Sequence, residues 1–245
     1  MSVDKPFTKD NIDSYLKELA KEFQKRNGNR IPAEIILIGG ASILINYGFR
    51  EMTYDIDAII QSSGAMKDAI NTVGDRLGLS VGWLNTDFIN TESYTPKLVQ
   101  YSKYYKTFSN IIQVRTVSAE YLVAMKLMAG RQYKNDLSDI VGILIEQEEK
   151  GDSFTLDRIK KAVVDLYDFY ERLPDNSRTF IESIYKKEDL KGFYQQCREL
   201  ELENKDVLLE FQNDYPKVLN RDNLADILKA AREKKNSRKG HNDKV

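Results

Sequence analysis

The sequence has almost none of the residues that would cross-link it or supply histidine chemistry. Among its 245 residues there is one cysteine, Cys197, which excludes an internal disulfide framework and favours a reducing compartment. There is also one histidine, His241, which lies in the C-terminal tail. No histidine is therefore placed to act as a general base in the main part of the chain.

The chain also lacks an excess of charge and a long hydrophobic run. Its 37 Lys and Arg nearly balance its 38 Asp and Glu, so no global field attracts nucleic acid. Its longest apolar stretch, Ile35–Ile45, contains two glycines and a serine and is far shorter than the ~20 residues of a membrane helix. The N-terminal residues have no apolar core typical of a signal peptide. We expect a soluble, cytoplasmic protein with no membrane partner, and 41% hydrophobic residues allow it a real core.

Glycine becomes scarce in the second part of the chain, where only Gly192 and Gly240 follow Gly151. The first part alternates runs with strand-like and helix-like patterns. We predict helices over 8–27, 41–47, 66–77, 121–129 and 137–149, and strands over 34–38, 55–60, 97–102 and 111–117. This alternation predicts an α/β or α+β domain, with a small mixed sheet flanked by helices.

The second part has helical spacing of apolar residues with few breaks. The apolar residues at these positions are Leu156, Ile159, Val163, Leu166 and Tyr170, and further on Leu190, Phe193, Cys197 and Leu200. We predict a first domain over 1–150, an all-helical domain over 151–228 and a tail over 229–245. The tail is basic, and its end is predicted to be disordered.

Two carboxylates, Asp55 and Asp57, stand at the start of the strand-like run 55–60. Alternation along a strand places both on one face, about 5 Å apart, where they repel by roughly 3 kcal/mol at an effective dielectric near 20. One interpretation is a polar strand end that water and salt screen. The other is a divalent cation between the two, because Mg²⁺ binds one or two carboxylates together with substrate phosphates.

The turn before this strand favours the second interpretation. Gly39-Gly40-Ala41-Ser42 follows a strand and opens a helix. Glycines let the backbone approach a ligand closely, and the free N–H groups of a helix start favour a phosphate. The Ser42 hydroxyl adds a donor. Phosphate donors beside metal ligands suit a nucleoside triphosphate with Mg²⁺, although no Walker loop and no dinucleotide fingerprint is present.

These residues form a pattern that resembles a known family. The chain is similar to the nucleotidyltransferase superfamily with a DNA polymerase beta-type palm, and within it to the AbiEii-like branch, which includes toxins of toxin–antitoxin and abortive-infection systems. A second stretch resembles that branch's downstream motif, a lysine on one helix followed by acids at the start of the next. The first motif comprises Gly39, Gly40, Ala41, Ser42, Gly48, Arg50, Thr53, Asp55 and Asp57, and the second comprises Lys126, Arg131, Asn135, Asp136 and Asp139.

The resemblance implies roles for these residues. Asp55 and Asp57 would ligate Mg²⁺, and Ser42 with the Gly39–Gly40 backbone would hold the triphosphate. Lys126 would reach the triphosphate, and Asp136 would orient Lys126 or the acceptor. Arg50 and Thr53 belong to the implied nucleotide-binding set. The fold it implies is the small mixed sheet of the nucleotidyltransferase palm.

Each of the charged residues also has a plainer interpretation. Lys126 lies in an apolar helix and could extend its ammonium group to the surface. Asp136 and Asp139 are three residues apart at a helix start, where acids suit the helix dipole. Arg50 could pair with surface acids. Arg131 and Lys134 are more simply solvated surface charges.

The superfamily usually has a third carboxylate on a later strand, which activates the acceptor hydroxyl. The predicted strand 111–117 offers Gln113 and Arg115 instead of an acid, so Asp87 is the alternative candidate. The function that the resemblance implies is Mg²⁺-dependent transfer of a nucleotidyl group from an NTP to a hydroxyl of RNA, a protein or a small molecule, with an antitoxin as partner if the protein is a toxin. The missing acid keeps open an inactive protein that binds a nucleotide or a partner.

Overall fold

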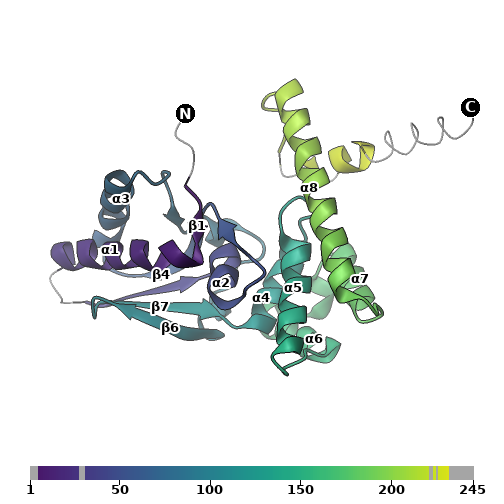
Figure 1. Cartoon of the computed structure of the whole chain (residues 1–245), viewed down its shortest axis with the longest axis horizontal. Helices are drawn as coiled ribbons and strands as arrows, with labels where there is room; N and C mark the ends of the chain where they lie inside the picture. The colour runs from purple at the N-terminus through teal and green to yellow at the C-terminus, as the bar shows by residue number, and fades with distance from the viewer. Residues whose placement is uncertain (1–4, 28–30, 221–222, 225, 232–245) are drawn as a thin grey trace, which may run out of the picture.

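The protein has a mixed sheet with helices in its first half and helices alone in its second half, which confirms the predicted fold class (Figure 1). The computed structural model describes residues 5–27, 31–220, 223–224 and 226–231. Within these residues, no helix is both long enough and apolar enough to span a membrane. Of the predicted tail, 229–231 are helical, and 232–245 lie outside the described residues.

The main sheet has five strands in the order β5-β4-β2-β7-β6. Central strand β2 runs antiparallel to β4 and parallel to β7, while β5 is parallel to β4 and β6 is antiparallel to β7. A separate two-stranded pair joins β1 to β3. The strands are β1 (Phe7–Thr8), β2 (Ala33–Leu37), β3 (Met52–Thr53), β4 (Ile56–Gln61), β5 (Leu84–Asn85), β6 (Ser102–Phe108) and β7 (Ile112–Val117).

Strand β2 is apolar except for the half-buried Glu34, because both faces of the strand are covered. Ile35 and Leu37 belong to one apolar cluster, which helices α1 (Lys9–Asn27) and α3 (Ala65–Leu77) cover from one side of the sheet (Figure 1). Trp83 is buried in this cluster, where its indole N–H donates to the carbonyl of Ile70 at 3.0 Å. Ile36, on the opposite face of β2, belongs to a second cluster.

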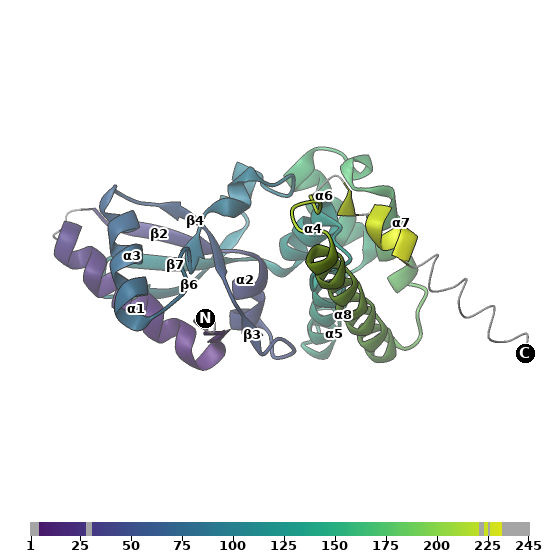
Figure 2. The same ribbon diagram turned by 90° about the horizontal axis from the view of Figure 1, so that it is seen from above.

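The second cluster extends from the sheet into the helical half, so the two halves share one core. Helix α4 is buried over nearly its whole length and packs against α5, α6 and α7. Helix α8 packs along α5 and forms the outer side of the molecule (Figure 2). The remaining helices are α2 (Gly39–Asn46), α4 (Ala119–Ala129), α5 (Asp136–Glu149), α6 (Leu156–Tyr167), α7 (Asp175–Ile184) and α8 (Leu190–Asp214), with short 3-10 segments η1 (Asp87–Asn90), η2 (Pro96–Val99) and η3 (Tyr170–Arg172).

The strand predicted over 97–102 is wrong. This stretch forms η2 instead, and the strand begins at Ser102 and continues to Phe108. Pro96 has a fixed backbone angle and no N–H to give to a sheet, and the Thr95 hydroxyl caps the turn by accepting from the N–H of Lys97 at 3.3 Å. The true strand, with sequence SKYYKTF, lies at the sheet edge, where exposed lysines discourage pairing with another chain.

One face of α5 fixes the connection between α2 and β4, which we call the 48–55 segment. The Glu146 carboxylate accepts the backbone N–H groups of Gly48 at 2.6 Å and Phe49 at 2.9 Å. One turn earlier, Gly142 lies directly beneath the Phe49 ring, so that an added Cβ would come within 2.7 Å of it. The 48–55 segment, which includes Arg50 and Asp55, therefore takes its position from a helix almost a hundred residues further along the chain.

We expect Gly142→Ala to lower the free energy of unfolding by about 1–3 kcal/mol, because the methyl group must displace the Phe49 ring. Urea denaturation measures this change. Gly64→Ala is the matched control: Gly64 has a helical φ of −57° and no atom within 4 Å of an added Cβ, so its stability should stay within about 0.5 kcal/mol of wild type. Equal stabilities for the two variants would contradict the anchoring of the 48–55 segment by α5.

Candidate active site

The turn between β2 and α2 brings backbone and side chains together without room for a Cβ. Gly39 has a φ of +53°, which suits glycine. A Cβ on Gly40 would lie 2.8 Å from an Arg50 guanidinium nitrogen and 2.9 Å from the Thr53 hydroxyl. Gly40 is therefore needed for the close approach of the 48–55 segment, a local packing reason that adds to any role in phosphate binding.

The two acids of the first motif lie where β4 begins. Asp55 is exposed and precedes the strand, whereas Asp57 is half-buried within it. The Thr53 hydroxyl donates to the Asp55 backbone carbonyl at 3.2 Å and stands 3.4 Å from its carboxylate. Burial raises the pKa of Asp57, and the negative charge of Asp55 raises it further. The pair therefore carries the like-charge strain that a bound cation would relieve.

Asn85 links Asp57 to Asp87. The β4–β5 register places Asn85 opposite Asp57, and the nearby Asn85 amide favours the charged form of Asp57 and so opposes the rise in its pKa. The Asn85 side-chain oxygen accepts the backbone N–H of Asp87 at 2.9 Å. The three residues thus line one rim of the site, although Asp87 is itself exposed.

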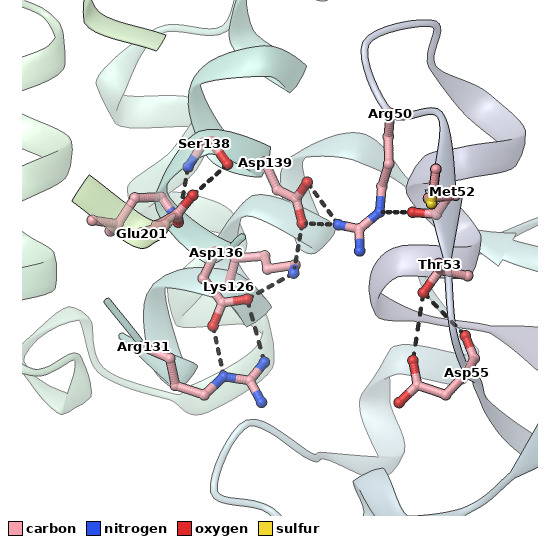
Figure 3. Close-up of polar contacts among 11 residues, drawn as sticks. Arg50, Met52, Thr53, Asp55, Lys126, Arg131, Asp136, Ser138, Asp139 and Glu201 are labelled. Atoms are coloured by element: carbon pink, nitrogen blue, oxygen red, sulfur yellow. Dashed lines mark hydrogen bonds and ion pairs between the residues drawn. The ribbon is translucent and has the colours of Figure 1, made fainter. Parts of the chain in front are cut away.

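A buried chain of alternating charges lies opposite the acids (Figure 3). At its centre, the Lys126 ammonium donates to Asp136 at 2.7 Å and to Asp139 at 2.8 Å. Arg131 also donates to the Asp136 carboxylate, at 2.7 and 3.3 Å, and Arg50 donates to the Asp139 carboxylate, at 2.6 and 2.9 Å. We call these five residues the Lys126 network, and its two aspartates are almost fully buried.

Charge partners rather than burial decide the ionisation of the Lys126 network. Burial alone would lower the pKa of Lys126, but Asp136 and Asp139 raise it above its ordinary value. Burial alone would raise the pKa of Asp136, but Lys126 and Arg131 lower it. Lys126 and Asp136 are therefore both charged near neutral pH, as a buried ion pair must be to offset its desolvation.

A cavity of about 230 Å³ brings the two charged groups face to face. Its acidic side is formed by Asp55, Asp57 and Asp87, and its basic side by Lys126, Arg131 and Lys134. Gly39 and Asn85 also line it. A wider cleft of about 1150 Å³ adjoins this cavity, with Asp55 and Lys134 in the wall of both, and runs between the 48–55 segment and α8.

The structure separates the predicted site residues into three groups. Gly39, Asp55, Asp57, Asp87, Lys126 and Arg131 line the cavity. Arg50 and Thr53 line the wider cleft. The others do not line either space. Asp136 and Asp139 lie behind the basic wall as partners of Lys126, and Gly40 leaves room for the Arg50 side chain. Ser42 is fully buried, and its hydroxyl has no hydrogen-bond partner among the described residues.

Among the polar residues of the cavity, sequence reasoning did not identify Asn85 and interpreted Lys134 only as a solvated surface charge. Lys134 is exposed by surface area and forms no ion pair within the described part of the chain, while desolvation at the cavity wall and the nearby Arg131 lower its pKa. The sequence does not show that Asp136 forms an ion pair with Arg131. It therefore could not indicate that Lys134, three residues further on, is the cation without an ion pair at the cavity. Asn85 could have been found only by knowing that β5 pairs with β4.

The donor set at the acids fits Mg²⁺ in part. Nowhere in the described residues do three or more His, Cys, Asp or Glu side chains gather closely enough to hold a metal ion. Two carboxylates, with the strain noted above, match the way Mg²⁺ binds when substrate phosphates and water complete its coordination. The residues present therefore suit an ion that arrives with its substrate.

Comparisons with known proteins place the chain near nucleotidyltransferases. A family model described as nucleotidyltransferase of unknown function (DUF6036) matches residues 14–192, a range that includes every cavity residue. A solved structure similar to this chain is an antigenic nucleotidyltransferase-like protein from Paracoccidioides brasiliensis, at 13% sequence identity and a TM-score of 0.42, with 78% of this chain and 95% of that chain covered. The chain matches none of the curated proteins.

We expect Lys126→Met to lower the free energy of unfolding by about 3–5 kcal/mol, because it leaves Asp136 and Asp139 buried without their shared cation. Lys134→Met is the matched control and should change stability by about 0.5 kcal/mol or less, since Lys134 is exposed. Urea denaturation of both variants at pH 7 measures the difference. Similar stabilities would show that the Lys126 network does not hold the helices together.

The contribution of the Lys126 network to stability should depend on pH with two limits. The folded pKa of Asp136 is below its ordinary value of 3.8, so its contribution is present above that pH and is lost as the pH falls through the folded pKa. The folded pKa of Lys126 is above 10.5, so its contribution is present below that pH and is lost as the pH rises through the folded pKa. The stability difference between wild type and Lys126→Met, measured by urea denaturation from pH 3 to 11, should be flat at neutral pH and shrink at both ends. A difference that peaks at either end would contradict this assignment.

Proposed function

Because the chain belongs to the DUF6036 family of nucleotidyltransferases of unknown function, we propose that it transfers a nucleotidyl group from an NTP to a hydroxyl acceptor with the help of Mg²⁺. The observation that carries this proposal is the two-sided cavity, in which acids face cations. A magnesium–triphosphate complex has the matching division of charge. Family membership supports the reaction class, and the cavity supports the place where it occurs.

Asp55 and Asp57 would hold the ion on the acidic side. Bound there, Mg²⁺ would supply Lewis-acid stabilisation of the charge that develops on the departing pyrophosphate. Asn85, which lies opposite Asp57 on β5, favours the charged form of Asp57 that a cation requires. Burial and the charge of Asp55 raise the pKa of Asp57, and a bound cation would lower it again by favouring the charged form.

Lys134 and Arg131 would meet the phosphates on the basic side. Lys126 has already donated two of its three N–H bonds to Asp136 and Asp139, so its main contribution is to fix the wall. Arg131 presents an edge of its guanidinium group while Asp136 holds the other. Lys134 is the cavity cation with no ion-pair partner among the described residues, which makes it the strongest candidate for direct phosphate contact.

Asp87 is the residue we assign to the proton of the acceptor. The acceptor oxygen bonds to the α-phosphorus, the bond from that phosphorus to pyrophosphate breaks, and the hydroxyl proton passes to Asp87. Asp87 lines the cavity and is exposed, so it can reach a group that arrives from solvent. The wider cleft offers the route for an RNA end, a protein side chain or a small molecule.

The AbiEii-like resemblance of the motifs adds a biological setting to this proposal. In that setting the protein is a bacterial, cytoplasmic toxin whose nucleotidyl transfer an antitoxin partner restrains. Expression of the wild-type gene and of an Asp55→Asn/Asp57→Asn variant in a bacterial host tests whether the protein is a toxin. Growth arrest by wild type alone supports the toxin role, and equal growth counts against it.

We expect the purified protein to transfer label from α-³²P NTPs to a component of cell extract when Mg²⁺ is present. Asp55→Asn/Asp57→Asn should reduce transfer on the order of 100-fold or more, because ligand loss removes several kcal/mol of charge stabilisation in the transition state. Asp10→Asn/Asp68→Asn, a change of the same charge at two exposed helix positions, should transfer label like wild type.

The same experiment distinguishes the alternative, a protein that binds nucleotide without turnover. The specific observation behind it is that, within the described residues, no third acid joins Asp55 and Asp57 closely enough to share a metal ion with them. Mg²⁺-dependent NTP binding by wild type, lost in Asp55→Asn/Asp57→Asn but unaccompanied by label transfer, would support the alternative. If the wild-type protein shows no NTP binding and no label transfer, both the transferase and the nucleotide-binding alternative are overturned.

A further inference from the structure

Two polar residues on α8, Glu201 and Asn204, are buried to 3% exposure although α8 lies on the outer side of the molecule. They are three residues apart and therefore share one face of the helix. Both lie beyond residue 192, where the match to the family model ends. Their burial requires partners, and the partners belong to the segment that includes the basic cavity wall.

Glu201 caps the start of α5 from a distant part of the chain. Its carboxylate accepts the backbone N–H groups of Leu137 at 2.7 Å and Ser138 at 3.2 Å, and the Ser138 hydroxyl at 2.6 Å (Figure 3). The first N–H groups of a helix have no partner within it, and the local N-cap residue, Asn135, makes no capping bond with its side chain. Glu201 thus supplies the cap that the local sequence lacks.

Asn204 holds the other end of the same segment. Its side-chain amide donates to the backbone carbonyl of Gln132 at 2.5 Å. Between Gln132 and Leu137 lie Lys134, which faces the phosphates in our proposal, and Asp136, which is the centre of contact for Lys126 and Arg131. Residues on two adjacent turns of α8 therefore form hydrogen bonds with both ends of the short connection between α4 and α5.

We propose that Glu201 and Asn204 are positioning residues, which set the place of Lys134 and Asp136 at the cavity by fixing the 131–138 segment from α8. The meaning of this placement for nucleotide binding rests on the proposed function, whereas the ordering of the segment does not. The part of α8 that lies beyond the matched family region thereby completes the site that the family region contains.

The cost of the arrangement argues against a purely stabilising role. Glu201 is only 3% exposed, and this burial raises the pKa of its carboxyl to about 7, at the expense of the charged form. An apolar side chain on this face of α8 would pack without that cost. What a carboxylate adds is a fixed geometry, because its two oxygens engage three donors of α5 at once.

Hydrogen exchange and nucleotide binding together test this inference. We expect Glu201→Leu and Asn204→Leu to speed amide exchange in peptides over 131–140 by about tenfold, since each loses hydrogen bonds to the backbone. Both should weaken binding of α,β-methylene NTP analogues with Mg²⁺ by about tenfold, measured by calorimetry well below the melting temperature. Glu201→Gln, which keeps an accepting oxygen, should recover most of both effects.

Cys197→Ala is the matched control, because Cys197 is buried on α8 one turn before Glu201 and packs in the apolar cluster. It should lower the melting temperature but leave exchange over 131–140 and nucleotide affinity at wild-type values. Unchanged exchange in Glu201→Leu would overturn the inference, and so would faster exchange with unchanged affinity. If wild type binds no analogue, the proposed function fails, and wild-type exchange rates in Glu201→Leu and Asn204→Leu would then overturn the ordering of the segment separately.

Discussion

The buried ion pairs of Lys126 with Asp136 and Asp139 are the contact on which the rest of the site depends. They join α4 to α5, and through Arg50 they join α5 to the 48–55 segment that leads into β4. Each buried charge in the Lys126 network is stable only because its neighbour of opposite charge is present, since an isolated buried charge costs several kcal/mol. The acidic and basic walls of the cavity therefore keep their separation through side chains that lie mostly behind them.

Helix α5 is the common support of this arrangement. Its start is capped by Glu201 from α8, its first turns hold the two aspartates, and its last turn accepts the backbone of Gly48 and Phe49 through Glu146. The helical half is thus part of the site's construction. The same network also decides which cation is available for a ligand: Lys126 is occupied, and Lys134 is not paired within the described residues.

Much of the fold and part of the site could be predicted from the sequence because the relevant signals are local. Apolar periodicity located α1, α3, α4 and α5, and the Gly39–Gly40 turn and the Asp55 and Asp57 pair mark positions where few residue types suffice. The error at 97–102 arose because Pro96 and Thr95 set a turn that the apolar pattern does not show. The position of Ser42, which the resemblance assigned to the triphosphate, shows a further limit: its hydroxyl is enclosed by the core, and burial cannot be read from a motif.

The sequence by itself determined the chemical types at the site, because two neighbouring carboxylates, a glycine turn and scattered cations follow from residue identity and spacing. Only the tertiary structure decided which charge meets which. Lys126 is paired twice, Arg131 is held by Asp136, and Lys134 remains to face the acids, because packing brings together residues 50, 126, 136, 139 and 201 from four separate elements. Pairing energies depend on distance and burial, and both are properties of the folded chain.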